Sequence, residues 1–389
     1  MNTNQLKRFA QEARTKLLQQ VGAKMNYVLS QDTSELRGRT DTLQKLNEEI
    51  HRHGKEAVID KVGYTWFNRL VALRFMDVNG YQPIGLSVVS PATSDHVSPQ
   101  ILTEAHSGNI PGELKVNKTQ LFDILDGRQP SNNPDNEVYR MLLVAACNHL
   151  SHLFPFLFER IEDYTELLLP DDLTSPFSIV TDIVNGMAEE DCREVEIIGW
   201  LYQFYISEKN EELIQSKKTY KKDELAPASQ LFTPKWIVRY MVDNTLGQFW
   251  SECYPQTRIL TELEFYIKPD YVDKIKKREV NIEEVKFFDP CAGSGHILSY
   301  AFDVFYRIYE ELGYEPNRIP ELIITKNLWG VDIDQRASQL ASFVLLMKGR
   351  ERYRRFFRKI ESSSIVPNIY FYQDFETDSK FDNAEALGS

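Results

Sequence analysis

The motif with the clearest chemistry is Asp-Pro-Cys-Ala-Gly-Ser-Gly at residues 289–295, which lies between a short apolar run and an apolar helical pattern. Gly293 and Gly295 let the backbone turn sharply from strand to helix and leave space for a ligand. Many nucleotide-binding folds carry such a glycine pair, but the full G-x-G-x-x-G dinucleotide pattern is absent here. The Asp289 carboxylate would repel phosphate at the mouth of the loop. The motif therefore favours a cationic ligand without phosphate, and the ammonium and sulfonium groups of S-adenosylmethionine meet both conditions.

Two further acids stand where such a ligand would need them. A ribose-binding acid is expected at the end of the second strand, and Asp332 in Gly-Val-Asp-Ile-Asp occupies that place. The insertion at 315–327 accounts for the long gap from the glycine loop. A helix cap is the alternative role for Asp332, although Asp334 suits a cap better. Asp374 ends an expected third strand and could accept from an adenine amino group, with a strand-end turn as its alternative.

The elements around these residues alternate between strand and helix. Strands are expected at 285–289, 328–333 and 369–374, with helices after the first two. This order implies parallel pairing with right-handed crossovers. Upstream, we expect Thr233 to cap a helix and Pro234 to occupy its first turn. The residues expected on the inner side of that helix are Ile237, Met241, Leu246 and Phe249.

The preceding part of the chain, 1–224, has a mostly helical pattern. In 64–81, apolar residues recur every three or four positions, which predicts one buried helix face ending at Asn79-Gly80. The residues of that face are Tyr64, Phe67, Val71, Phe75 and Val78. An irregular excursion is expected over 81–119, with room for a short strand or two. Helices are expected again at 138–153, 175–187 and 194–209. The last carries the expected core residues Trp200, Leu201, Phe204 and Tyr205.

Composition limits the class of protein. The 389 residues, 42% hydrophobic and 26% charged, predict a globular protein of two or three domains, and the lysine-rich segment 217–227 suggests a boundary between domains. No apolar run is long enough for a transmembrane helix. The four scattered cysteines argue against a disulfide framework and for a reducing cytoplasm. Cys147, His149 and His152 lack the second ligand pair that a metal site needs, so no metal is expected.

The net charge of −12 implies that any contact with DNA comes from a local patch or from a segment outside this sequence. The segment Lys348–Ile360 concentrates Lys and Arg late in an expected helix. A solvated helix end that complements the macrodipole is the favoured interpretation. Phosphate contact is the alternative.

Four segments resemble an enzyme family. The runs at 228–242, 287–298, 329–334 and 372–375 resemble, in this order, motifs X, I, II and III of DNA adenine-N6 methyltransferases of the gamma arrangement. Within that group, 64–81 and 196–205 resemble the PglX family, the methyltransferases of BREX phage-defence systems. The resemblance extends over nearly the whole chain from about residue 55.

The resemblance implies a fold and a set of roles. The fold would be a mostly α N-terminal domain, 1–224, followed by an incomplete α/β Rossmann-like domain that binds S-adenosylmethionine, 225–389. The residues that would flank the methionine end of the cofactor are Phe232, Thr233 and Pro234. Those that would form the loop beneath it are Asp289, Pro290, Ala292, Gly293 and Gly295. Asp332 would bind the ribose, Ile333 the adenine face, and Asp374 would lie near the adenine amino group.

The implied function is site-specific adenine methylation of double-stranded DNA in the cytoplasm, which marks host DNA as self alongside other BREX proteins. The Asn/Asp-Pro-Pro-Tyr/Phe motif that holds a flipped adenine in this family is absent, since Asn133-Pro134 is followed by Asp135. The chain is therefore expected to be the N-terminal part of a longer enzyme and inactive by itself. A protein or RNA methyltransferase and a non-catalytic module that recruits defence proteins remain open, and cofactor binding separates the last from the first.

Overall fold

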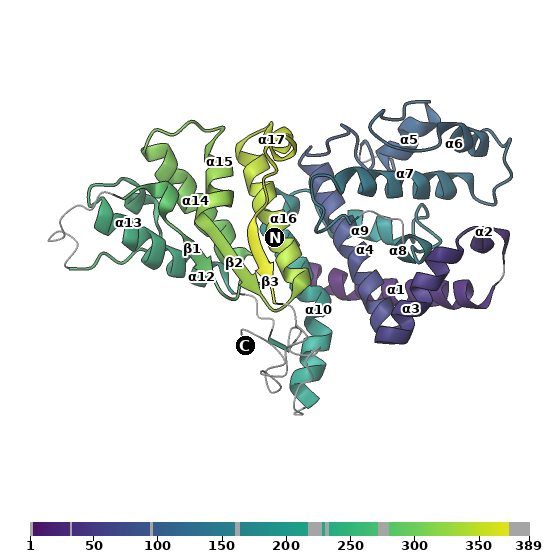
Figure 1. The fold of residues 1–389 in the computed structure, drawn as a ribbon, viewed down its shortest axis with the longest axis horizontal. Coiled ribbons are helices and arrows are strands. Elements are labelled where there is room, and N and C mark those ends of the chain that lie inside the picture. Colours follow the sequence, from purple (N-terminus) through teal and green to yellow (C-terminus); the bar gives the residue numbers. More distant parts are fainter. Residues whose placement is uncertain are drawn as a thin grey trace, which may run out of the picture. The chain divides into compact units, whose positions relative to one another are not determined.

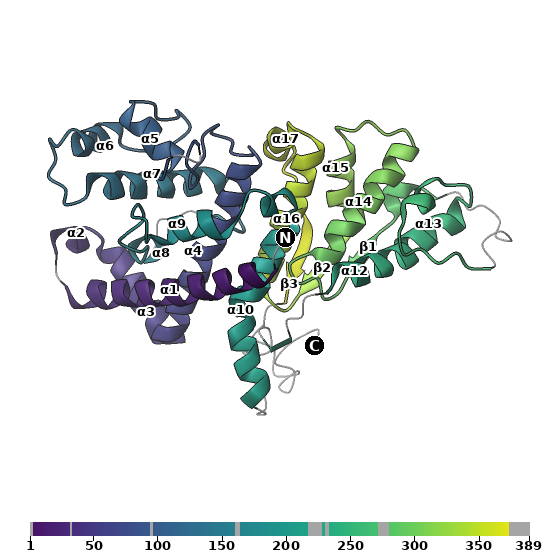
Figure 2. The ribbon, with the colours of Figure 1, turned by 180° about the vertical axis from the view of Figure 1, so that it is seen from behind.

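The structure is a computed structural model that describes residues 3–31, 33–93, 96–159, 164–216, 228–229, 233–270 and 280–372. The chain divides into two compact units, Met1–Glu208 and Lys209–Ser389, and Figures 1 and 2 show their elements from opposite sides. The boundary predicted at 224/225 falls among residues outside the described ranges and remains a prediction. In the described part of the chain, no helix is long and apolar enough to cross a membrane.

All regular secondary structure in the described residues of unit 1 is helical. Its elements are α1 (Thr3–Ser30), α2 (Ser34–Arg37), α3 (Thr40–His53), α4 (Lys55–Val78), α5 (Gln100–His106), α6 (Lys118–Leu125), α7 (Pro134–Leu150), α8 (Tyr164–Leu167), α9 (Ile179–Gly186), a 3-10 turn (Asp191–Arg193) and α10 (Glu196–Ser216), which continues into unit 2. The predicted helices near 138–153, 175–187 and 194–209 are confirmed as α7, α9 and α10. Leu201, Phe204 and Tyr205 lie in the core as expected, and Trp200 is half-buried.

Helix α4 is the centre of unit 1, with α1, α3 and α9 packed against it. The expected face is buried, except that Val78 is half-buried. The prediction of a single buried face was nevertheless too narrow, because Trp66, Leu70 and Leu73 on other sides are also fully buried. A helix can be buried on all sides only if its polar groups find partners inside the protein.

The segment after α4, in which short strands were expected, is instead organised by a buried carboxylate. Asp77 accepts hydrogen bonds from the backbone N–H groups of Val88, Val89 and Ser90, at 2.8 to 3.0 Å, and from the Gln82 side chain at 2.7 Å. Burial raises the pKa of Asp77, and these four hydrogen bonds oppose that rise. The described residues of 81–119 contain α5 and the start of α6 and no strand, so the expectation of short strands was wrong.

Unit 2 is built around a three-stranded parallel sheet. Its elements are α12 (Lys235–Val242), a π-helical turn η2 (Asp243–Gly247), α13 (Gln248–Cys253), 3-10 turns at Ile259–Glu262 and Ile282–Glu284, β1 (Phe287–Asp289), α14 (His296–Glu311), α15 (Ile319–Leu322), a second π-helical turn η6 (Ile323–Asn327), β2 (Leu328–Asp332), α16 (Gln335–Arg352), α17 (Phe356–Ser363) and β3 (Asn368–Phe371). The strand order is β1-β2-β3, and both neighbouring pairs are parallel, as predicted. The third strand ends at Phe371 rather than at Asp374, and Asp374 lies outside the described residues.

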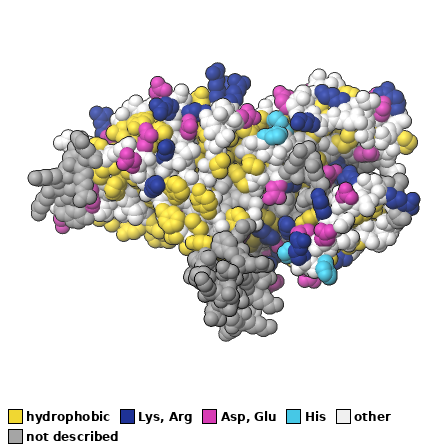
Figure 3. All heavy atoms as spheres, in the orientation of Figure 1, with side chains coloured by type: hydrophobic (Ala, Val, Ile, Leu, Met, Phe, Trp, Pro, Cys, Tyr) yellow, Lys and Arg dark blue, Asp and Glu magenta, His cyan; other side chains and the backbone are white. Residues whose placement is uncertain are grey.

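The two faces of this sheet differ. On one face, a side chain at Gly330 of β2 would collide with Leu298 of α14, so α14 packs directly on the strands. The other face carries Phe288 of β1 and Tyr370 of β3, which are 58% and 52% exposed, and Tyr370 stacks on Trp329 of β2. Figure 3 shows hydrophobic side chains gathered where Figure 1 places β1, β2 and α12. The helices that follow β1 and β2 therefore cover one face and leave the other open.

The inner face of α12 differs from the prediction. Thr233 does not provide the helix cap, because Pro234 is the N-cap residue and makes no side-chain hydrogen bond there. Met241 and Phe249 are 44% and 38% exposed, so their assignment to the inner side was wrong. The buried apolar side chains from α12 to α13 are Val238, Val242, Leu246, Trp250 and Cys253. The π-helical turn shifts the face that follows it relative to an α-helix, which affects Phe249 but not Met241, because Met241 precedes the turn.

Candidate functional site

The glycine loop lies at the carboxyl end of β1 and leads into α14. Gly293 and Gly295 have φ angles of 53° and 87°, both in the left-handed region that favours glycine. A Cβ atom at Gly295 would lie 3.0 Å from the Cα and Cβ atoms of Ala341 in α16, so this glycine allows the loop to approach α16 closely. A Cβ atom at Gly293 would meet nothing within 4 Å. One glycine therefore serves packing, and the other borders open space.

Asp332 at the end of β2 organises this loop. Its Oδ2 atom accepts a hydrogen bond from the N–H of Gly293 at 2.7 Å, and its Oδ1 atom accepts one from the N–H of Asp334 at 2.8 Å. The N–H of Ala292 donates to the carbonyl of Val331 at 3.0 Å, which ties the loop to β2 a second time. Asp334 caps α16 through the N–H of Arg336, the role that the sequence favoured for it. Each oxygen of Asp332 retains acceptor capacity beyond its backbone partner.

Asp289 is the loop carboxylate that has one oxygen without a hydrogen-bond donor. It is only 6% exposed, and its Oδ1 atom accepts from the N–H of Cys291 at 3.1 Å. Its Oδ2 atom is buried and has no hydrogen-bond partner among the described residues. Burial raises the pKa of Asp289, and the neighbouring Asp332 carboxylate raises it further. A buried carboxylate oxygen without a donor is costly by itself and is stabilised by a cationic ligand.

The orphan oxygen of Asp289 and the open space beside Gly293 together fit the ammonium end of S-adenosylmethionine. Ala292 is buried in the loop, whereas Pro290 and Cys291 are exposed. Ile333 is 50% exposed directly after β2, where a flat ring could lie against it.

The structure places some of the remaining expected residues and leaves others undescribed. Thr233 is half-buried and Pro234 exposed at the start of α12, which packs on α14. Phe232 and Asp374 lie outside the described residues. The structure thus brings Asp289, Gly293 and Asp332 together, and the roles of all these residues stay predictions.

Sequence reasoning missed one buried residue in this region. Asp243 in the π-helical turn after α12 is fully buried and accepts from the hydroxyl of Tyr300 at 2.9 Å and the N–H of Phe265 at 3.0 Å. Because Tyr300 lies on α14, this contact ties the helix after Pro234 to the helix after the glycine loop. A π-helical turn often marks a functional site. An acid within an otherwise apolar helical pattern was the available signal.

His296, the first residue of α14, is expected to make the stability of unit 2 depend on pH in the acid range. Burial lowers the pKa of His296 from 6.5 to about 4, so between these pH values the unfolded chain binds more protons than the folded chain. Its contribution to stability is therefore complete above about pH 6.5 and is lost as the pH falls toward 4. Between pH 6.5 and pH 4.5, the free energy of unfolding of His296→Gln should therefore fall by about 2 kcal/mol less than that of the parent. Urea unfolding of both proteins at pH 6.5 and pH 4.5 tests this, and equal pH dependence would contradict it.

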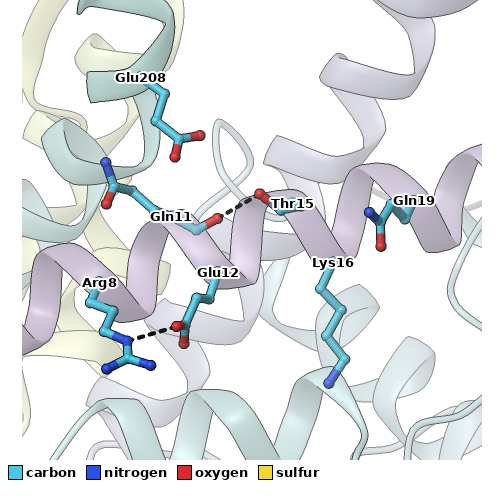
Figure 4. A pocket seen from close by; sticks show the side chains of 7 residues that line it. All are labelled: Arg8, Gln11, Glu12, Thr15, Lys16, Gln19 and Glu208. Atoms are coloured by element: carbon cyan, nitrogen blue, oxygen red, sulfur yellow. Dashed lines mark hydrogen bonds and ion pairs between the residues drawn. The ribbon is translucent and has the colours of Figure 1, made fainter.

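Two other places in unit 1 do not provide a competing site. A cavity of about 420 Å³ is lined by Arg8, Gln11, Glu12, Thr15, Lys16, Gln19 and Glu208 (Figure 4). Its charges are already paired, Arg8 with Glu12 and Lys16 with Asp182.

The thiol of Cys147 is fully buried, and burial raises its pKa to about 12, which opposes the thiolate that a metal would need. In the described ranges, no cluster of three His, Cys, Asp or Glu residues could hold a metal ion.

Comparison with known proteins adds to this geometry. No family model matches the chain. The chain is 37% identical, over 99% of its length, to a protein of Escherichia coli O9:H4 (strain HS) named adenine-specific methyltransferase BrxX. It is 33% identical, over 95% of its length, to a protein of Lacticaseibacillus casei (strain Zhang) named adenine-specific methyltransferase PglX. The chain is a relative of the PglX family.

The resemblance seen in the motifs is thereby confirmed along nearly the whole chain, in both units. The chain spans about a third of the length of each PglX-type relative, 33% and 34%. The names of the relatives state an adenine-specific methyltransferase activity for those proteins.

Proposed function

We propose that this PglX-like chain is the helical N-terminal part and the cofactor-binding half of a DNA adenine-N6 methyltransferase. The observation that carries the proposal is the buried carboxylate of Asp289, whose Oδ2 atom lacks a donor beside the open side of a glycine loop. The names of the relatives support adenine as the methylated base. In a BREX-like system, the enzyme would methylate double-stranded host DNA in the cytoplasm and mark it as self, together with other defence proteins.

Bound S-adenosylmethionine supplies an electrophilic methyl group on its sulfonium. In the proposal, the Asp289 carboxylate binds the ammonium of the ligand, and Asp332 accepts from the ribose hydroxyls while it holds Gly293. Ile333 contacts the adenine face, and Phe232, Thr233 and Pro234 border the methionine end. Asp374 binds the adenine amino group. The π-turn carboxylate of Asp243 holds α12 against α14 through Tyr300 and so keeps the two sides of the ligand site in register.

The site that holds the acceptor adenine is the part of the proposed enzyme for which these 389 residues offer no motif. Methyl transfer requires the amino nitrogen to lie about 3–3.5 Å from the methyl carbon and in line with the sulfonium bond. A protein that methylates adenine in duplex DNA must first flip the base into a pocket. The sequence holds no Asn/Asp-Pro-Pro-Tyr/Phe motif for this purpose. We therefore assign cofactor binding, and not methyl transfer, to this chain when it is tested alone.

The proposal is tested by titration calorimetry of the chain with S-adenosylmethionine. We expect one binding site for S-adenosylmethionine and no binding of NAD or ATP, because Asp289 repels their phosphates. Incubation with tritiated S-adenosylmethionine and adenine-rich duplex DNA should give no methyl transfer by this chain. A chain extended to the length of its relatives should methylate adenine, and Gly293→Arg in that protein should not. Tight binding of NAD would contradict the ligand, and methylated RNA or protein would contradict the substrate.

A further inference from the structure

The end of α16 and the start of α17 form a concentrated basic surface. Seven of the thirteen residues from Lys348 to Ile360 are Lys or Arg, and one is Glu, in a chain whose net charge is −12. Figure 3 shows cationic side chains gathered where Figure 1 places α17. Because the rest of the chain is strongly acidic, a partner of high negative charge can approach favourably only at such a place.

Some of these cations have structural partners. Lys348 lies 2.7 Å from Asp303, Lys359 lies 2.6 Å from Glu321, and the Arg352 guanidinium lies 3.1 Å from Asp303. Arg352 also lies over the ring of Tyr306 at 4.7 Å. These contacts attach the end of α16 and part of α17 to α14 and α15.

Three arginines differ from these. Arg354, Arg355 and Arg358 are exposed, and none of them has an ion pair or hydrogen bond to another described residue. We call these three residues, which lie just before and within the first turn of α17, the α17 arginines. Each presents a planar guanidinium that can bind the oxygens of a phosphate through two parallel hydrogen bonds.

The position of the α17 arginines argues against a role in helix stability. The favoured interpretation of the sequence placed them late in a helix, where cations complement the macrodipole. Helix α16 ends at Arg352, and Arg355 is the N-cap of α17, with Arg358 in its first turn. Positive charge at the start of a helix is unfavourable to the macrodipole. The local structure therefore gives no reason for three exposed cations here, and a ligand with negative charge does.

The α17 arginines also lie far from the candidate cofactor site. Helix α16 starts just after the carboxyl end of β2 and has 18 residues, so it carries the chain back about 27 Å toward the amino ends of the strands. A duplex that lay along α16 and reached both places would span about eight base pairs, at about 3.4 Å each. The α17 arginines therefore contact neither the cofactor nor the target base.

We propose that the α17 arginines bind the backbone phosphates of duplex DNA, without sequence preference, at a surface separate from the acceptor site. This inference depends on the proposed function, because it takes duplex DNA as the substrate of the enzyme. Contacts of this kind position a protein on the duplex and make its binding steeply dependent on salt.

The test measures the fluorescence anisotropy of a labelled 20-base-pair duplex with the 389-residue chain between about 50 and 200 mM salt. We compare the parent with the triple variant Arg354→Glu, Arg355→Glu, Arg358→Glu. The matched control is Lys45→Glu, Lys115→Glu, Arg193→Glu, which changes the net charge equally at three exposed positions of unit 1. We expect binding about 30-fold weaker in the α17 variant at the lowest salt, with a log–log salt slope shallower by about 2 to 3. The control should stay within about threefold of the parent.

Several results would overturn the proposal. They are undetectable DNA binding by the parent, equal affinity in the α17 variant, or an equal loss in the control, which would make net charge the cause. Tighter competition by poly-glutamate than by DNA would assign the surface to an acidic protein instead. Calorimetry with S-adenosylmethionine on the same samples reports the proposed function separately, because the α17 arginines lie outside the cofactor site. Unchanged cofactor affinity in the variant shows that unit 2 is folded.

Discussion

Replacing each glycine of the loop by alanine is expected to separate stability from ligand binding. Gly295→Ala should lower the free energy of unfolding by about 3 kcal/mol. About 1–2 kcal/mol of this comes from placing alanine in the left-handed region, and the remainder comes from crowding against α16. The crowding arises because the new Cβ atom would lie 3.0 Å from the backbone Cα of Ala341, which cannot rotate away. Thermal and urea unfolding measure this loss, which would belong to unit 2.

Gly293→Ala should have the opposite profile. Its φ of 53° costs alanine about 1 kcal/mol, but its Cβ atom meets nothing within 4 Å, so the fold tolerates it. In the proposal, that open space holds the ligand, and the affinity for S-adenosylmethionine should fall more than tenfold in calorimetry. Gly313→Ala is the matched control, with a φ of 78°, an equally open Cβ position and no place in the loop. Parent-like affinity in Gly293→Ala would show that the ligand does not lie against this glycine.

The strand order of unit 2 could be read from the sequence because its signals are local. Each strand is a short apolar run, and glycines and acids follow the first two within a few residues. Parallel pairing then follows from the helices between the strands. The same local signals identified Asp289 and Asp332, and the structure places both around one loop. The unfilled position on Asp289 could not be predicted, because it depends on which backbone donors the folded loop supplies.

The errors share a different cause. Phe249 was misassigned because the π-helical turn at Asp243–Gly247, which shifts the face that follows it, is held by tertiary contacts, including those of Tyr300 and Phe265 to Asp243. Met241 precedes this turn and lies one position from the buried Val242, so the buried face of α12 itself was misplaced by one residue. No pattern of period 3.6 reveals such a turn.

In unit 1, the irregular residues after α4 are organised by Asp77, which accepts from three backbone N–H groups eleven to thirteen positions away. Periodicity detects neither this contact nor the burial of α4 on all sides. Both depend on polar groups that are satisfied at long range.

Asp332→Ala is expected to weaken S-adenosylmethionine binding by about 100-fold. The substitution removes the proposed acceptor of the ribose hydroxyls, and charge-assisted hydrogen bonds contribute roughly 1.5–3 kcal/mol each. It also frees the N–H of Gly293, which Asp332 holds at 2.7 Å, so the loop loses its tether. Asp334→Ala is the neighbouring control, because it removes the cap of α16 and should lower stability by about 1 kcal/mol with little change in affinity.

The direct and indirect contributions of Asp332 can be separated with a cofactor analogue that lacks the ribose 2′-hydroxyl. If the carboxylate binds the ribose, the parent should discriminate against the analogue by about tenfold, and Asp332→Ala should bind both ligands equally weakly. If Asp332 acts only through the N–H of Gly293, the variant should keep the discrimination of the parent while losing affinity for both ligands. The second outcome would remove Asp332 from the proposed ribose site and leave it as the residue that shapes the glycine loop. Calorimetry with the two ligands and the two proteins forms a double-mutant cycle. Its interaction energy is close to zero if the carboxylate and the hydroxyl are not in contact, and differs from zero if they are.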